Sequence, residues 1–276
     1  MNGSQAAVFA VTSAKGGVGK SFFAPNFAVA LMRETKGRVL LVDLDLAWAG
    51  DALAPLGNNP PRRALSDLAP LVGSLPASML KGYLDVHPSG LSYLAACHRP
   101  DQAAGLEPAA VARCLELLSQ AFDILVLDLD TGYGPFNQAC LDQASHLFML
   151  LTPDLYAVNH TCQGLEQLQA LGFARQMVSL VLNRQDPKGE LGPEAVAARL
   201  GRELAGVIPE DAAAVAQSLH QRSLLILDRP RHPISRALDE LAASLWARGV
   251  ADLSQRRARL SAPVSATPAA PAGPAA

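Results

Sequence analysis

Two lysines and three glycines stand close together near the start of the chain, where residues 14–21 read Ala-Lys-Gly-Gly-Val-Gly-Lys-Ser. The glycines are Gly16, Gly17 and Gly19. Because they lack a Cβ, they let backbone N–H groups turn inward around phosphate oxygens, which a side chain would obstruct. Lys20 can reach the terminal phosphates of a nucleotide, and the Ser21 hydroxyl can ligate Mg²⁺. The segment therefore predicts a phosphate-binding loop that works with Mg²⁺, and an unrelated glycine-rich turn is the weaker interpretation.

Acidic residues end two apolar runs further along the chain. Val39–Val42 leads into Asp43 and Asp45, and Ile124–Leu127 leads into Asp128. Mg²⁺ and an attacking water need carboxylates at the carboxyl ends of the strands that flank a phosphate loop. Taken alone, an aspartate at the end of a strand is more often a turn or cap residue. The phosphate loop upstream favours a functional role for Asp45 and Asp128.

These residues need a frame that brings strand ends together, and apolar runs alternating with helical patterns predict one. The expected strands lie at 7–13, 39–42, 91–95, 124–127, 147–151, 178–182 and 205–208. The expected helices run from the glycine loop to about Lys36 and then over 108–120, 155–171, 194–203, 212–220 and 234–247. Near-continuous apolar strands are typical of a sheet covered on both faces. We therefore predict an α/β fold with a doubly wound, mostly parallel sheet and helices on both faces, with loops and short helices over 46–90.

The glycine loop departs from the general pattern G-x-x-x-x-G-K-[ST], because position 14 is Ala. The form present is K-G-G-x-G-K-[ST], and with it the chain resembles the MinD/ParA family of P-loop ATPases over about residues 7–248. The resemblance implies that the nucleotide is ATP, that the ATP-bound chain is a homodimer, and that hydrolysis is slow and stimulated by a partner. It also implies that Lys15 reaches across the dimer interface to the other subunit's nucleotide. The nucleotide contacts expected in the loop are Lys15, Gly16, Gly17, Val18, Gly19, Lys20, Ser21 and Phe22.

The resemblance also assigns roles to the strand-end residues. Asp45 matches the aspartate that orients the attacking water, and Asp128 matches the one that holds Mg²⁺ through water. Residues 129–132 match the switch that senses the γ-phosphate. The expected catalytic residues are Lys15, Lys20 and Asp45. The expected metal ligands are Ser21, Asp45 and Asp128.

Two later residues fit a pocket for the base. Asn183 ends the apolar run 178–182, and the family uses such an Asn to read adenine through its amide. Pro209 lies in a segment, 206–211, that is similar to one that packs beside the base in MinD. Asn and Pro are also ordinary turn residues at strand ends, so that role is the alternative for both.

Three residues depart from the family pattern. Phe22 stands where the family usually has Thr, which removes a hydroxyl contact to phosphate. Pro25 removes a backbone donor early in the first helix, and Asp130 stands where the family more often has Pro or Thr. These departures bear on the rate of hydrolysis and not on binding, and they keep open a scaffold that binds ATP and seldom hydrolyses it.

One branch of the family is favoured by local detail. The stretch 43–46 followed by Gly50 and Asp51, the stretch 94–100, and the stretch 182–184 resemble the CpaE/TadZ branch, which serves assembly and polar placement of Tad-type pili. The expected function is therefore an ATP-dependent switch that positions or assembles a cellular structure, a pilus or a secretion apparatus. A flagellar-number regulator of the FlhG type is the nearest alternative by role, and CpaE-like members often carry an N-terminal receiver-like domain.

Composition limits the other classes. The chain has 23 Lys and Arg against 25 Asp and Glu, a net charge of −2, which argues against a ParA-type DNA partitioner because that needs a basic surface. The four cysteines are scattered, with no Cys-x-x-Cys pair, which argues against a metal-cluster carrier. No signal peptide or long apolar stretch is visible, so we expect a cytoplasmic protein, in a polar position or at the periphery of the inner membrane.

The chain is expected to form one ATPase domain over residues 1–250. Residues 251–276 are expected to be a short helix end and a disordered tail rich in Ala and Pro. Residues 250–260 mix apolar side chains with arginines, a pattern that suits an anionic membrane surface only weakly. A solvated helix end is the favoured interpretation of that segment.

Overall fold

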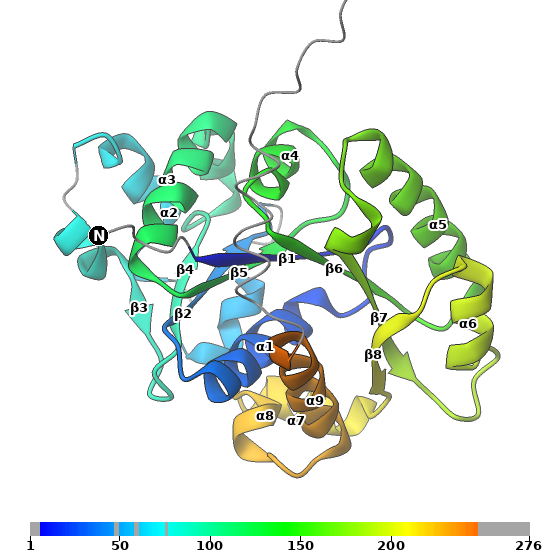
Figure 1. Ribbon diagram of the computed structural model, residues 1–276. Coiled ribbons are helices and arrows are strands. Elements are labelled where there is room, and N and C mark those ends of the chain that lie inside the picture. The colour runs from blue at the N-terminus through cyan, green and yellow to red at the C-terminus, as the bar shows by residue number, and fades with distance from the viewer. Residues whose placement is uncertain (1–5, 47–49, 58–60, 75–76, 248–276) are drawn as a thin grey trace, which may run out of the picture.

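The computed structural model describes residues 6–46, 50–57, 61–74 and 77–247, and an eight-stranded sheet runs through its middle (Figure 1). The strands are β1 (Ala7–Thr12), β2 (Val39–Leu44), β3 (Asp85–Val86), β4 (Ser92–Ala95), β5 (Ile124–Leu129), β6 (His146–Leu151), β7 (Val178–Gln185) and β8 (Leu204–Pro209). Their order is β3-β4-β2-β5-β1-β6-β7-β8. Every pairing is parallel except that of β3, a two-residue edge strand antiparallel to β4. The carboxyl ends of β2, β5, β1 and β6 therefore lie side by side.

Helices cover both faces of this sheet, as Figure 1 shows. The α-helices are α1 (Lys20–Thr35), α2 (Leu65–Leu68), α3 (Pro108–Ala121), α4 (Pro135–Leu141), α5 (Leu155–Ala170), α6 (Pro193–Leu200), α7 (Ala212–His220), α8 (Leu225–Asp228) and α9 (Pro233–Ala247). Short 3₁₀ helices are η1 (Asp51–Leu56), η2 (Ala69–Leu71), η3 (Ala77–Tyr83), η4 (Pro100–Gly105) and η5 (Arg175–Met177). Alternate residues of each central strand point to opposite faces, so the core forms two clusters. One packs β1, β2 and β6 against α1, α8 and α9, and the other packs the opposite faces against α3, α4 and α5.

The predicted fold class is confirmed, and the long elements lie where the apolar patterns predicted them. The short elements β3, α4 and α8, and the 3₁₀ helices η4 and η5, were not predicted, because each is too short to show a periodic pattern. Pro25 does not interrupt α1: it removes the donor to one first-turn carbonyl, and the helix continues to Thr35. The expected tail at 251–276 and the basic stretch after Ala247 lie outside the described residues. No described helix is long and apolar enough to cross a bilayer.

Candidate functional site

The glycine loop joins the end of β1 to the start of α1 at the centre of the sheet. Gly17 and Gly19 have φ angles of 76° and 97°, a left-handed conformation that side-chain-bearing residues rarely adopt. Gly19 also has no room for a side chain, since a Cβ there would lie 2.5 Å from the Asn183 amide nitrogen. The loop is followed directly by the N-terminus of α1, whose free N–H groups favour an anion. The backbone is therefore shaped to surround phosphate oxygens.

Asn183 holds the loop from the neighbouring end of β7. Its side chain is buried, and its amide nitrogen donates a hydrogen bond of 2.8 Å to the carbonyl oxygen of Val18. The predicted role of Asn183 in reading adenine stays a prediction, and the structure adds that the same amide fixes the phosphate loop. Pro209 ends β8 and pairs with Gln185 of β7, so the structure places both residues expected at the base on adjacent strand ends.

The two lysines of the loop have different partners. The Lys20 ammonium donates to the Ser13 hydroxyl at 3.1 Å, and that hydroxyl donates to the Lys15 carbonyl at 2.8 Å. The Lys15 ammonium forms an ion pair of 3.0 Å with Asp154 of the same chain, and both side chains are 38% exposed. Lys15, which the family resemblance expects to reach the other subunit's nucleotide, is therefore paired within its own chain here.

Asp154 is the N-cap of α5 and was missed by the sequence interpretation. Its carboxylate accepts from the Ala157 N–H at 2.9 Å and from the Thr152 hydroxyl at 2.7 Å. Burial opposes ionisation, but hydrogen bonds from Thr152, Ala157 and Lys15 outweigh it and lower the pKa of Asp154. A strand followed by Thr-Pro-Asp before a helical pattern is an N-cap signal that would have pointed to this residue.

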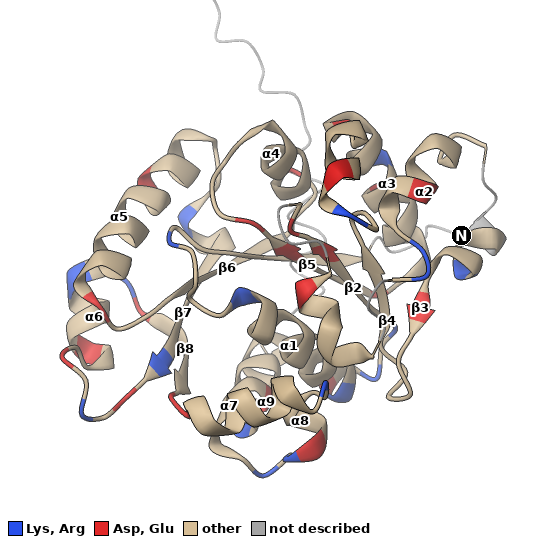
Figure 2. Cartoon of the chain, turned by 180° about the vertical axis from the view of Figure 1, so that it is seen from behind, with Lys and Arg blue, Asp and Glu red and all other residues tan. Residues whose placement is uncertain are grey.

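Two buried carboxylates lie next to each other on β2 and β5, where Asp43 and Asp128 are register partners. Figure 2 shows these acidic strand ends together beside the start of α1. Asp43 accepts hydrogen bonds from the N–H groups of Asp45 and Ala52, both at 3.1 Å. Burial and then the charge of Asp128 raise the pKa of Asp43 well above its ordinary value. Asp43 therefore holds Asp45 and the first turn of η1 beside the end of β2.

Asp128 is buried without such support. Neither of its oxygens accepts a hydrogen bond of normal geometry from the described residues. Burial raises its pKa to about 7, the charge of Lys20 and the nearby Ser21 hydroxyl oppose this rise, and the charges of Asp45 and Asp130 add to it. A buried carboxylate that lacks donors is a candidate for binding a cation.

The residues present fit Mg²⁺ as phosphate loops hold it. Ser21 and Asp128 lie close together, and Asp45 is near enough for its charge to raise the pKa of Asp43, Asp51 and Asp128. No group of three or more His, Cys, Asp or Glu side chains in the described part of the chain forms a ready metal cage. Mg²⁺ does not require one, because it keeps several waters and takes phosphate oxygens as ligands. When bound, Mg²⁺ would neutralise charge on the phosphates next to Asp128.

The loop after Asp128 is held by side-chain amides of α4. The amide of Asn137 donates to the carbonyls of Asp130 and Gly132 at 3.3 and 3.0 Å, and that of Gln138 donates to the Tyr133 carbonyl at 2.7 Å. The segment predicted to sense the γ-phosphate is therefore tied to a short helix that the sequence did not predict.

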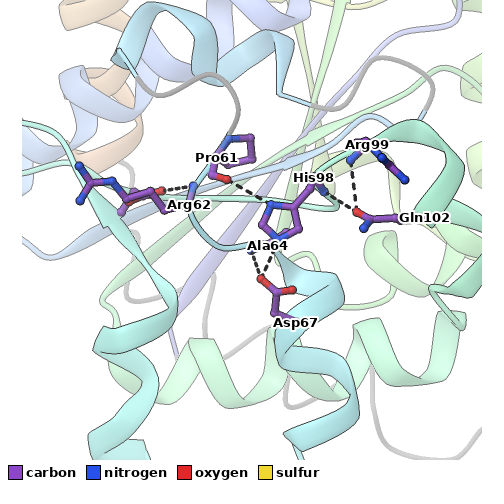
Figure 3. A network of polar contacts seen from close by, with 8 residues as sticks. Pro61, Arg62, Ala64, Asp67, His98, Arg99 and Gln102 are labelled. Atoms are coloured by element: carbon purple, nitrogen blue, oxygen red, sulfur yellow. Dashed lines mark hydrogen bonds and ion pairs between the residues drawn. The ribbon is translucent and has the colours of Figure 1, made fainter.

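A further polar network fixes the segment beside β4, which neighbours β2 (Figure 3). The ring of His98 bridges the Asp67 carboxylate, at 2.8 Å, and the Pro61 carbonyl, at 3.1 Å. Asp67 also accepts from the Ala64 N–H at 3.0 Å, and Gln102 accepts from the His98 N–H at 3.0 Å. The network anchors residues 61–67 against the end of β4, whose Ala95 is the register partner of Asp43.

A family model, the CobQ/CobB/MinD/ParA nucleotide binding domain, matches residues 9–224 of the sequence, and this site geometry agrees with it. The chain belongs to this family. An uncharacterized ATP-binding protein of Methanocaldococcus jannaschii is 25% identical over 87% of this chain and 88% of that protein. The septum site-determining protein MinD of Bacillus subtilis is 24% identical over 82% and 84%. The antiactivator FleN of Pseudomonas aeruginosa is 34% identical over a shorter stretch, 46% of this chain and 44% of that protein.

Solved structures of this family share the fold. A ParA family ATPase from Chlorobium tepidum superimposes with a TM-score of 0.80 at 24% identity, covering 87% of this chain and 98% of that one. The MinD protein of Pyrococcus horikoshii, complexed with Mg-ADP, superimposes with a TM-score of 0.76 at 21% identity, covering 90% and 98%. The resemblance to the MinD/ParA family is thereby confirmed, and the CpaE/TadZ branch stays a prediction.

The structure brings most of the predicted site residues together at one edge of the sheet. The loop residues from Lys15 to Ser21, with Asp45 and Asp128, converge there from three segments. Phe22 instead has its side chain packed against the core under α1, and its carbonyl accepts from Asn26 at 2.8 Å. Any contact of Phe22 with nucleotide would therefore come from its backbone N–H.

Proposed function

We propose that this chain binds ATP with Mg²⁺, dimerises in that state and hydrolyses ATP slowly. The observation that carries the proposal is the buried Asp128 carboxylate, which accepts no hydrogen bond of normal geometry from the described residues and lies near Lys20 and Ser21 of the phosphate loop. Mg²⁺ bound to nucleotide phosphates supplies the missing positive charge. In this proposal Lys20 binds the terminal phosphates, Ser21 and Asp128 hold the ion, and Asp45 orients the attacking water.

The proposed dimer requires Lys15 to leave its partner Asp154. Its ion pair with Asp154 is partly exposed, and such pairs contribute little to stability. The lysine can therefore leave Asp154 when the phosphates of a second subunit's ATP offer more negative charge. ATP then drives dimerisation because it binds the dimer more tightly than ADP does.

The cellular role we propose is positioning or assembling a larger structure, a pilus or a secretion apparatus, through a protein partner. This rests on the sequence features shared with the CpaE/TadZ branch, including Gly50 and Asp51 at the start of η1. A second candidate is a regulator of the FlhG type, and the 34% identity to the antiactivator FleN over 46% of this chain supports a regulatory role. A DNA-partitioning role is disfavoured by the net charge of −2.

The test is the molar mass of the chain in solution with ATP and Mg²⁺, with ADP, and without nucleotide, together with phosphate release. We expect a dimer only with ATP, a more persistent dimer in Asp45→Ala and none in Lys15→Ala. A mass that ignores nucleotide, with Lys15→Ala behaving like the parent, would contradict the switch. ATP-dependent dimers without phosphate release would instead identify a scaffold that binds ATP and does not turn it over.

A further inference from the structure

Helix α5 carries a glycine in its interior, where glycine is less favourable than alanine by about 1 kcal/mol. This residue, Gly164, lies under the phosphate loop. A Cβ at Gly164 would lie 3.0 Å from the Ala14 Cβ, 3.0 Å from the Tyr133 hydroxyl oxygen and 3.2 Å from the Met149 Cε. The absence of a side chain therefore allows the phosphate loop and the loop after Asp128 to pack together on α5.

The Tyr133 hydroxyl lies in the space that a side chain at position 164 would fill. Its hydroxyl donates a hydrogen bond of 3.3 Å to the Gly164 carbonyl. The side chain is partly buried, and burial raises the pKa of Tyr133 to about 12, so the hydroxyl keeps its proton at physiological pH. Tyr133 directly follows the segment 129–132 that is predicted to sense the γ-phosphate, so the bond links the loop 130–134 to the same helix whose N-cap, Asp154, holds Lys15.

We propose that Tyr133 is a positioning residue that holds the 130–134 loop in its resting place on α5, and that the loop leaves this contact when it engages the γ-phosphate of ATP. The inference rests on the proposed function, because it needs a loop that distinguishes ATP from ADP. The amides of Asn137 and Gln138 bind backbone carbonyls of the loop, whereas the Tyr133 hydroxyl binds a fixed carbonyl of a long helix. Removing the Tyr133 hydroxyl should therefore destabilise the resting position of the loop and leave the hydrogen bonds to the loop backbone in place.

The energetic argument is one of population shift. A contact made only in the resting state opposes any ligand that requires the engaged state, and it does not affect a ligand that leaves the loop at rest. Removing one neutral hydrogen bond should therefore tighten binding of ATP by about two- to fivefold and leave the affinity for ADP unchanged. The long distance of 3.3 Å favours the lower end of that range.

The experiment measures Kd for fluorescent ADP and for a fluorescent non-hydrolysable ATP analogue, both with Mg²⁺, in the parent chain, Tyr133→Phe and Tyr83→Phe. Tyr83 is a matched control, because its ring lies under the Arg63 guanidinium and the loss of its hydroxyl keeps that contact. We expect Tyr133→Phe alone to bind the analogue two- to fivefold more tightly and to dimerise at correspondingly lower concentrations of it. Equal shifts for both nucleotides, no shift, or the same shift in Tyr83→Phe would overturn the inference.

Gly164→Ala provides a second, independent variant. The Ala14 Cβ cannot rotate away from a new methyl group, so this change should displace the phosphate loop and weaken both nucleotides, with the melting temperature reporting whether the fold survives. If Gly164→Ala folds and binds both nucleotides as the parent does, the packing argument is wrong. If the parent chain binds ATP and ADP with equal Kd and has the same oligomeric state with both, the proposed function itself is wrong. The parent chain alone shows this, without any variant.

Discussion

The ends of β2 and β5 carry aspartates that are neighbours in the sheet and equally buried, yet their surroundings differ. Asp43 receives two backbone N–H groups, from Asp45 and Ala52. Asp128 accepts no hydrogen bond of normal geometry from the described residues, and only the charge of Lys20 and the nearby Ser21 hydroxyl compensate its own charge. One carboxylate is satisfied by the fold, and the other is the one to which the proposed function assigns Mg²⁺.

This difference separates a stabilising role from a functional one. A buried carboxylate with two donors fixes the loop that follows β2, and its loss leaves those donors without an acceptor. A buried carboxylate without donors lowers the stability of the empty chain, because its charge is desolvated and uncompensated. A cation bound there, as the proposed function requires, would relieve this cost.

The largest effect is expected from Asp128→Asn. The variant keeps the shape of the side chain and removes its charge, so it should lower Mg²⁺-dependent ATP hydrolysis by roughly 100-fold or more. The same change should raise the free energy of unfolding of the nucleotide-free chain at pH 7.5, by on the order of 1–3 kcal/mol. Phosphate release and urea denaturation measure the two effects. A destabilised Asp128→Asn would show that the carboxylate has a structural partner after all.

The matched change at the other strand end should have the opposite sign for stability. Asp43→Ala leaves the N–H groups of Asp45 and Ala52 without their acceptor, which should lower the free energy of unfolding by about 2 kcal/mol. Asp43→Asn retains an oxygen acceptor and should lose less. Urea denaturation of both variants and of Asp128→Asn measures the changes in the free energy of unfolding. Equal changes at the two aspartates would contradict the difference proposed here.

The pH dependence of stability should follow Asp128. Folding raises the pKa of this acid from 3.8 to about 7, so the folded chain binds its proton more tightly than the unfolded chain does. Stability therefore falls as the pH rises from about 4 to 7 and changes little above that, and the raised pKa of Asp43 acts in the same direction. We expect the nucleotide-free chain to gain roughly 1–2 kcal/mol between pH 7.5 and 5.5.

The variant Asp128→Asn removes this contribution, together with the part of the rise in the Asp43 pKa that the charge of Asp128 causes. Burial lowers the pKa of His87, which opposes the gain at acid pH, but His87 is common to both chains and cancels in the comparison. Carboxyls whose pKa is lowered, such as Asp154 and Asp123, are ionised throughout this range and do not contribute to it. An identical pH profile for the two chains would mean that Asp128 titrates normally.

The contrast between Asp43 and Asp128 also shows which features of the site could be predicted from the sequence and which could not. Apolar runs ending in aspartate predicted both strands and the edge where they end, because burial on both faces leaves a clear pattern. Which aspartate has donors depends on the Ala52 N–H, nine residues further along the chain, lying beside Asp43, and no local pattern encodes that. The pairing of Lys15 with Asp154, 139 residues apart in sequence, likewise depends on β1 and β6 being neighbours.

The smallest effect concerns Asp154, a third carboxylate of this edge, which is partly exposed and has both donors and a cation. Asp154→Asn keeps an acceptor for the Ala157 N–H and removes the ion pair with Lys15, so stability should change by less than about 0.5 kcal/mol. Asp154→Ala also removes the cap and should cost about 1 kcal/mol. If Asp154 holds Lys15 at rest, the Asn variant should dimerise at an ATP concentration lower by about two- to fivefold. A requirement for more ATP would instead place Asp154 among the residues that hold Lys15 in the assembled dimer, and the ion pair would then belong to both states of the switch.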